Sequence, residues 1–255
     1  MHLFPIVEMM GMKFDLSAII AIIVTMVVIL ILARLAVRNL SVENPGKMQN
    51  FLEWIVDFVH STIASTMPLE KAKKFISLGM TIILFIFVAN ILGLPFQIIT
   101  ETHEPNEFLG ITAEYLKSHD GEAHISWWKS PTADLSVTSG LAIVMFFIIH
   151  FLGVKWNAKH YFQHYFKPYP IFFPINLIET IAKPVTLALR LYANILAGEI
   201  LISTILMLGF AGLPFMAIWQ GFSIFVGAIQ AFLFTVLTMV YISQAAVHDE
   251  EEHAH

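Results

Sequence analysis

The chain has 255 residues, of which 57% are hydrophobic and only 13% are charged; water-soluble domains usually carry about twice that charged fraction. The net charge of −5 offers no basic surface for nucleic acid, and the lack of cysteine excludes disulfides, thiolate catalysis and cysteine-ligated metal centres. The composition therefore predicts a membrane protein.

The first long apolar stretch covers residues 16–37. A helix of about 20 residues crosses the hydrocarbon core of a bilayer, so this stretch is long enough to span it. The residues before it contain one lysine and no compact basic region, and no small-residue cleavage pattern follows it. We therefore interpret 16–37 as a membrane-spanning helix and not as a removable signal peptide.

The next segment, residues 44–66, predicts an amphipathic helix. Its apolar residues recur at steps of three and four, at Met48, Phe51, Leu52, Trp54, Ile55, Phe58 and Val59. Polar residues lie opposite them, at Asn50, Glu53 and Asp57. We expect this helix to lie in the membrane interface; packing on a soluble domain is the alternative, but the chain contains no such domain.

Two further spans are predicted at 75–95 and 135–154, separated by a loop at 97–132. The loop is acidic, with Glu101, Glu104, Glu107, Glu114, Asp120 and Glu122. These carboxylates could gather cations at an entrance or could simply be solvated, and the sequence leaves both readings open.

The last two apolar stretches, 171–208 and 214–247, are too long for upright spans. Residues 174–207 and 214–247 could each form a helix of 34 residues, about 51 Å long, whereas the hydrocarbon core is about 30 Å thick. We therefore expect a steeply tilted hairpin that turns at 209–214 and offers a concave wall to a large rounded partner. The expected fold is an all-α membrane protein with one domain, five transmembrane helices, one interfacial helix and a tail at 248–255.

The distribution of the 14 Lys and Arg residues predicts the orientation. If the spans alternate, one side receives Arg34, Arg38, Lys47, Lys71, Lys73, Lys74, Lys155, Lys159 and Lys167. The other side receives Lys13, Lys117 and Lys129. Because basic residues favour the cytoplasmic side, we expect the N-terminus outside and the tail in the cytoplasm.

Two charged residues interrupt the apolar stretch LALRLYANILAGEILIST at 187–204. At 100° per residue, Arg190 and Asn194 share one helix face with Lys183, whereas Glu199 points about 180° away from Arg190. An unpaired arginine at the bilayer centre costs about 2.5 to 3.5 kcal/mol or more, so such residues usually face a bundle interior or a water-filled path. The alternative is that this arginine has a purely structural role and forms hydrogen bonds with Asn and Gln side chains.

Arginine and glutamate suit different tasks at this position. Because its pKa exceeds about 12, Arg190 stays charged and cannot pass its proton on. Glu199 can relay protons, because a partly buried carboxyl can titrate near neutral pH. On the last helix Ser223, Gly227, Gln230 and Tyr241 fall on one stripe. We expect Gln230 to be the neighbour of Arg190.

The other polar positions carry weaker predictions. Asn90 lies within a predicted span, where it could either join two helices or have a functional role. Asp134 could either cap the start of a helix or line an aqueous entrance. Lys183 either snorkels to the interface or lines an exit. His160 and His164 lack a carboxylate partner, so we expect no metal site. We also expect no cofactor and no hydrolase site, because the sequence has no nucleophile elbow, phosphate loop or HExxH motif.

The chain resembles subunit a of the bacterial F-type ATP synthase membrane sector. The resemblance rests on GKMQNFLEWIVDFV, FVANILGLPF, WWKSPTADLSVT, KPVTLALRLYANILAGEI and SIFVGAIQAFLFTVLTMVYIS, in that order. It implies a stator beside a ring of c subunits, held by the b subunits of the peripheral stalk, with two offset half-channels and no ATP site of its own. Arg190 would face the ring carboxylates, with Gln230 as its neighbour and Asn194 and Glu199 in the ion path.

The same resemblance implies less defined roles in the ion path for Asn90 and Asp134. Some relatives carry histidine where this chain has Ser223, or lysine where it has Gly198, which leaves Glu199 as the expected relay. The sequence does not decide between protons and sodium ions, although protons are expected. A rival function is a secondary transporter that holds an anion at Arg190, but such transporters usually contain paired repeats.

Overall fold

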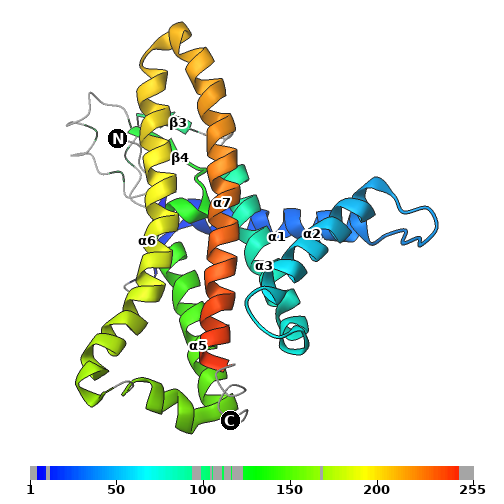
Figure 1. The fold of residues 1–255 in the computed structure, drawn as a ribbon. Helices are drawn as coiled ribbons and strands as arrows, with labels where there is room; N and C mark the ends of the chain where they lie inside the picture. Colours follow the sequence, from blue (N-terminus) through cyan, green and yellow to red (C-terminus); the bar gives the residue numbers. More distant parts are fainter. Residues whose placement is uncertain are drawn as a thin grey trace.

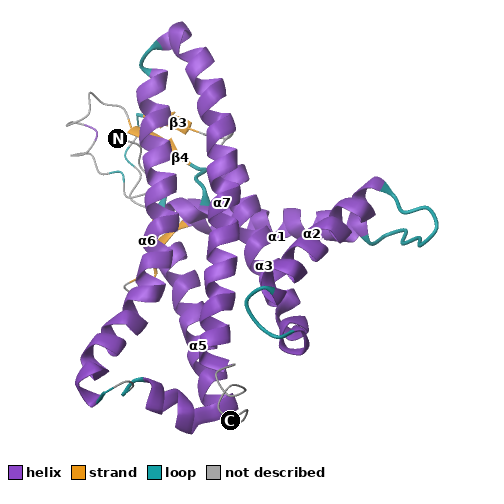
Figure 2. Cartoon of the chain, in the orientation of Figure 1, coloured by secondary structure: helices purple, strands orange, loops and turns teal. Residues whose placement is uncertain are grey.

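The computed structural model describes residues 5–9, 12–93, 99–103, 123–166 and 169–246, with residues 105, 111 and 116. In these ranges the elements are β1 (Ile6–Met9), β2 (Met12–Asp15), α1 (Leu16–Ala36), α2 (Lys47–Ala64), α3 (Leu69–Gly93), β3 (Ile99–Thr102), β4 (Ala123–Ser126), η2 (Pro131–Ala133), α5 (Leu135–His164), η3 (Pro170–Phe172), α6 (Phe173–Leu206), η4 (Gly209–Gly212) and α7 (Leu213–Ala246). Figures 1 and 2 show their arrangement. The expectations for the tail at 248–255 and for most of the acidic loop concern residues outside these ranges.

Among the described residues, five segments are long and apolar enough to cross a membrane: Leu16–Ala36, Glu70–Gly93, Leu135–Trp156, Phe173–Leu206 and Gly209–Ala245. The predicted all-α membrane fold is therefore confirmed. Two helices extend beyond the expected spans, because α3 begins at Leu69 and α5 continues to His164. Hydropathy marks only the apolar part of a helix, whereas the backbone hydrogen bonds continue through the polar residues beside it.

Two small β-hairpins were not expected from the sequence. β1 pairs with β2 from Ile6 opposite Asp15, and β3 pairs with β4 from Ile99 opposite Ser126. Each strand has only four residues, which is too short to give a clear alternation of apolar and polar residues in the sequence. β1 and β2 lead directly into α1, and the chain that follows β4 leads through η2 into α5.

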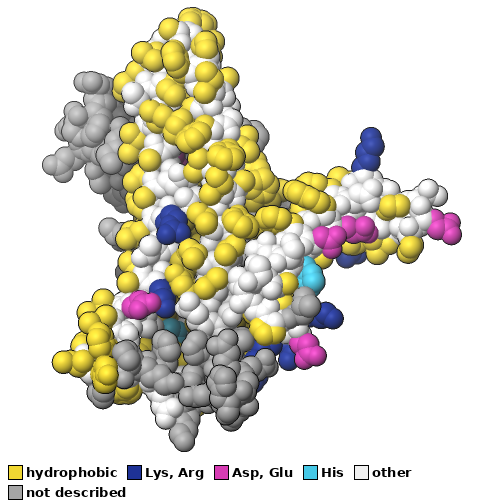
Figure 3. Space-filling view, in the orientation of Figure 1, with side chains coloured by type: hydrophobic (Ala, Val, Ile, Leu, Met, Phe, Trp, Pro, Cys, Tyr) yellow, Lys and Arg dark blue, Asp and Glu magenta, His cyan; other side chains and the backbone are white. Residues whose placement is uncertain are grey.

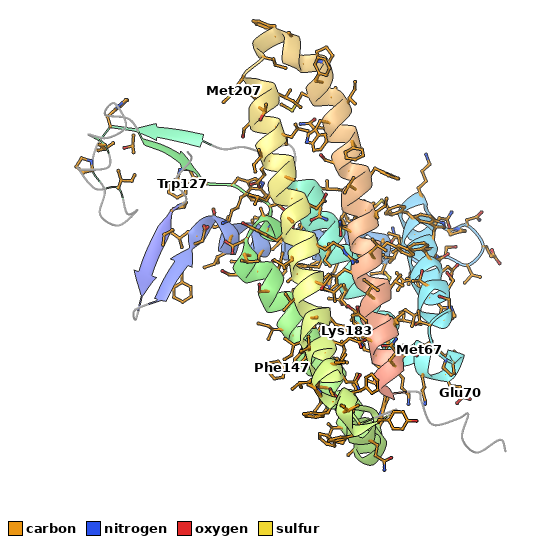
Figure 4. The ribbon with its side chains drawn as sticks, turned by 60° about the vertical axis from the view of Figure 1, so that its left-hand side comes forward. Met67, Glu70, Trp127, Phe147, Lys183 and Met207 are labelled. Atoms are coloured by element: carbon orange, nitrogen blue, oxygen red, sulfur yellow. The ribbon has the colours of Figure 1, made fainter. Side chains whose placement is uncertain are left out.

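The long C-terminal hairpin consists of α6 and α7, which have 34 residues each and lie side by side (Figure 1). Each is about 51 Å long, whereas the 21 residues of α1 span about 31 Å and match the hydrocarbon thickness. In Figures 1 and 4, α1 crosses the hairpin and does not run along it. A membrane crossed by α1 therefore leaves the hairpin strongly slanted, in agreement with the tilt expected from its length.

The apolar core lies where α2, α3, α5, α6 and α7 meet. It contains Val59, Ile63, Phe75, Ile82, Ile86, Met145, Leu187, Leu191, Phe234, Met239 and Ile242. On the outside of α2, Phe51, Trp54 and Phe58 stack in a row with ring centroids 6.3 and 6.1 Å apart. All three are exposed, as an interfacial helix requires.

Candidate functional site: a surface arginine between two cavities

Arg190 lies in the middle of α6 and is exposed. Its neighbours Leu187 and Leu191 are buried in the core, and Leu189 is 49% exposed on the outside. Figure 3 shows one face of the hairpin, on which hydrophobic side chains are numerous and charged side chains are few. Within the described part of the chain, Arg190 has no hydrogen bond or ion pair. The guanidinium is thus available to a partner that covers the hairpin.

One cavity lies toward the turn of the hairpin, and we call it the tip-side cavity. It is lined by Asn90, Gly93, Ser130, Asn194, Ile195, Gly198, Glu199, Ile202, Trp219, Phe222, Ser223 and Val226. The indole Nε1 of Trp219 is buried and has no hydrogen-bond partner among the described residues. Because a buried donor is costly without an acceptor, a water molecule in this polar cavity would satisfy it.

A second cavity lies toward the other end of the hairpin, and we call it the base-side cavity. Its volume is about 90 Å³, which is room for several water molecules. The polar side chains that line it are His150, Tyr161, Tyr165, Thr180, Lys183, Tyr241 and Gln244. They come from α5, α6, α7 and the turn after α5.

The two cavities lie on opposite sides of Arg190 along α6. The base-side cavity uses α6 residues up to Leu187, and the tip-side cavity uses those from Asn194 onward. These two residues are about 10 Å apart along the helix axis. In Figure 4, Lys183 lies toward the end of the hairpin that is next to α5, and Met207 lies near the turn at the other end. Arg190 therefore lies between two cavities that contain polar side chains and are offset along one helix.

The expected division of polar residues between the two faces of α6 is only partly correct. Glu199 is half-buried and lines the tip-side cavity, away from the exposed Arg190. Asn194 was expected on the face of Arg190, but it lines the same cavity as Glu199. A helical wheel gives only the direction of each side chain, whereas this cavity extends between α6, α7, α3 and Ser130 and reaches both residues.

Asn90 is buried and joins three elements. Its Nδ2 donates to the carbonyl of Gly227 on α7 at 3.2 Å, and its Oδ1 accepts from the Thr132 hydroxyl at 2.7 Å. The Ser130 hydroxyl donates to the carbonyl of Ala89 at 3.1 Å. Asn90 thus joins helices, one of its two expected roles, and it also lines the tip-side cavity.

Asp134 and Lys129 belong to an ion cluster that the sequence analysis missed. Lys129 Nζ is 2.7 Å from Asp134 and 2.5 Å from Asp15, and its side chain is only 9% exposed. Asp15 caps α1, and Asp134 caps α5 through the Ser136 amide at 2.8 Å. Asp134 is therefore a helix cap, and it is not among the residues that line the tip-side cavity.

The pKa values of two members of this cluster are shifted. Burial alone would lower the pKa of Lys129, but hydrogen bonds to Asp134 and Asp15 outweigh it, so the pKa lies above its ordinary value. Burial alone would raise the pKa of Asp134, but the hydrogen bond from Lys129 outweighs it, so the pKa lies below its ordinary value. Both groups are charged at neutral pH. Lys129 also acts electrostatically on Glu199.

The remaining predicted residues have less specific surroundings. Lys183 pairs with Glu179 at 3.1 Å and lies 5.2 Å above the ring of Tyr241. Gln230 is half-buried, and in the part of the chain that the structure describes no hydrogen bond joins it to Arg190. The side chains of His160 and His164 lie outside the described residues.

The sequence matches the model of a known protein family described as "ATP synthase A chain" over residues 19–243. Similar proteins named ATP synthase subunit a include that of Bacillus subtilis strain 168, which is 43% identical over 97% of this chain and 99% of its own. Those of Bacillus velezensis and Listeria welshimeri are 42% and 44% identical, each over 97% of this chain and nearly all of their own length. With this identity over almost its full length, the chain belongs to the ATP synthase A chain family.

Proposed function

We propose that this chain is the stator of a rotary ATP synthase and forms two half-channels that carry ions to and from a c-ring. As a family member, it works in the bacterial plasma membrane with other ATP synthase subunits. The observation that carries the half-channel proposal is the position of Arg190 on the open face of α6 between two separate cavities, each of which has polar side chains in its lining. A single continuous channel would give no reason for ions to leave the chain and travel on a rotor.

The ion enters on the outer side through the tip-side cavity. Glu199 receives it there, with Asn194 and Ser223 as polar lining, and passes it to a carboxylate of the ring. The neutralised carboxylate can then move into lipid, because the cost of a charge in hydrocarbon has been removed. After nearly a full turn the ring carboxylate reaches the base-side cavity, where it releases the ion to the cytoplasm.

Arg190 prevents the ion from taking the short way between the cavities. Its permanent charge attracts the ionised ring carboxylate and repels a cation that tries to pass. Each elementary charge that crosses the membrane supplies about 2.3 kcal/mol per 100 mV. That free energy drives rotation only while the direct route past Arg190 is closed.

The orientation follows from this assignment. The hairpin turn and the cluster of Lys129, Asp15 and Asp134 lie outside, and the base-side cavity lies on the cytoplasmic side, as the distribution of basic residues predicts. The ring covers the exposed apolar face of α6 and α7. The b subunits of the peripheral stalk hold the chain against the ring's torque.

The rival function, a secondary transporter with an anion site at Arg190, fits the geometry poorly. A transported anion is normally enclosed near the bilayer midplane. Arg190 is exposed and is absent from the linings of both cavities. An anion at this position would be in contact with lipid on one side.

The test uses inverted membrane vesicles that contain the complete ATP synthase. Arg190→Ala and Arg190→Lys should abolish ATP-driven proton pumping while the complex remains assembled, and Arg38→Ala, in the turn after α1, serves as the matched control. Glu199→Gln should slow pumping strongly. Normal pumping by both Arg190 variants would refute the stator proposal, and anion uptake by the chain alone would favour the transporter.

A further inference from the structure

His150 is a titratable side chain that the proposed mechanism has not yet used. It lies in the second half of α5, is half-buried and lines the base-side cavity. Its Nδ1 is 2.8 Å from the carbonyl oxygen of Phe146. Because a carbonyl oxygen can only accept, Nδ1 carries a proton, and Nε2 is the nitrogen that gains and loses the second proton.

The surroundings hold this imidazole in place. Its ring lies 3.8 Å from the ring of Phe146 and 5.9 Å from that of Tyr161, measured between centroids. Tyr161 can pack there because residue 153 is glycine, where a Cβ would come within 2.6 Å of the tyrosine ring. The Tyr161 hydroxyl is 2.9 Å from that of Tyr165, whose carbonyl accepts from Asn176 of α6 at 2.9 Å. The cavity wall is therefore fixed to both helices.

The other ionisable side chains that line the cavity are three tyrosines and a lysine. Burial and the hydrogen bond with Tyr165 raise the pKa of Tyr161, so its hydroxyl stays protonated. Lys183 of α6 lines the cavity. Its ion-pair partner Glu179 does not, and the Glu179 side chain is 61% exposed. From α7 the cavity receives Tyr241 and Gln244, which are uncharged. Among the described residues that line the cavity, His150 carries the one imidazole, the side chain that most readily both accepts and donates a proton, and it is therefore suited to exchange protons with the cytoplasm.

We propose that His150 is the proton-exchanging residue of the base-side cavity. The proposal rests on the proposed function, because it assigns this cavity to the cytoplasmic half-channel. During synthesis, Nε2 accepts a proton released into the cavity by a ring carboxylate and, as imidazolium, gives the same proton to water at the cytoplasmic end. During ATP-driven pumping the same transfers run in reverse. His150 thus collects protons from the cytoplasm when few are free.

The test measures ATP-driven pumping by inverted vesicles with the complete complex while the external pH, which is that of the cytoplasmic face, is varied from about 6 to 9. His150→Gln should pump nearly normally at low pH and fall about tenfold below the wild type at high pH, as expected for loss of a proton donor and acceptor. His60→Gln, on α2 away from the cavity, is the matched control and should follow the wild type. The ATPase activity and the amount of the chain in the membranes are measured in parallel.

Two results would overturn the proposal. One is a His150→Gln profile that coincides with the wild type. The other is a loss by the same factor at every pH, which would assign His150 a structural role. If His150→Gln does not assemble, His150→Asn replaces it, and failure of both variants to assemble would also mean a structural role. None of these results affects the stator proposal, which stands or falls with Arg190→Ala at all pH values.

Discussion

Replacing Lys129 by Met should destabilise the chain. The substitution leaves the carboxylates of Asp15 and Asp134 beside each other without their cation, although they are only 18% and 17% exposed. Removing one partner of a fully buried ion pair costs about 3 to 5 kcal/mol. Because these carboxylates retain some contact with solvent, we expect about 3 kcal/mol, near the lower end.

The assay is the midpoint temperature at which the chain aggregates when the purified ATP synthase is heated in detergent. Lys73→Met, at an exposed position of α3, is the matched control. The triple variant Lys129→Met, Asp15→Asn, Asp134→Asn should recover most of the loss, because asparagine caps a helix about as well as aspartate and carries no charge. A Lys129→Met midpoint equal to that of the wild type would refute the reasoning, as would a triple variant no better than the single one.

Three further predictions concern the same region. The stability difference between wild type and Lys129→Met should shrink as the pH falls from about 7 toward about 4. Without Lys129, burial raises the pKa of Asp134 in the variant, so that protonation relieves its uncompensated charge, whereas in the wild type Lys129 keeps that pKa below its ordinary 3.8. A midpoint difference that grows as the pH falls would contradict this. Asn90→Leu should lower the same midpoint by the equivalent of about 1 to 3 kcal/mol, because it removes two buried hydrogen bonds, the one that Asn90 donates to the Gly227 carbonyl and the one that it accepts from the Thr132 hydroxyl; an unchanged midpoint would show that these bonds are dispensable. Gly93→Ala should reduce the amount of chain in the membrane, because the added Cβ would lie 2.3 Å from the Cβ of Ser130. Gly198→Ala is the control and should leave the amount unchanged, because its Cβ would have no atom within 4 Å. Immunoblots of membranes measure both amounts, and equal amounts would contradict the prediction.

The membrane fold was predictable because it depends on bulk properties of long segments. About 20 apolar residues are required to cross a bilayer, and segments that exceed this number must tilt. α1 accordingly begins at the expected residue, and the hairpin α6–α7 turns where GFAGLP predicts. Arg190 and Glu199 could also be recognised, because an ionised group within a span is costly and therefore conspicuous.

The ion cluster was not predictable, because each member has an ordinary local explanation. Asp15 and Asp134 are typical helix caps, and Lys129 contributed only to the charge bias between the two sides. Lys129 and Asp15 are 114 positions apart in sequence. Only the packing of α1 beside the start of α5 brings them together. The positions of Trp219 and His150 in cavity linings were not predictable for the same reason. Several helices form each cavity, and the sequence of a single helix does not indicate which of its residues face the cavity.

The ion cluster also explains why the two cavities are separate. Residues of α5 line the base-side cavity and are absent from the tip-side cavity, where Ser130 and α3 take their place. Helix α5 therefore begins near the level of Arg190. Its first turn is held in place by Asp134, which caps the helix and pairs with Lys129. If the start of α5 shifted by one turn, it would move by about 5.4 Å, about half the separation of the cavities along α6. A loop lysine that never meets the transported ion thus helps to keep the two cavities apart.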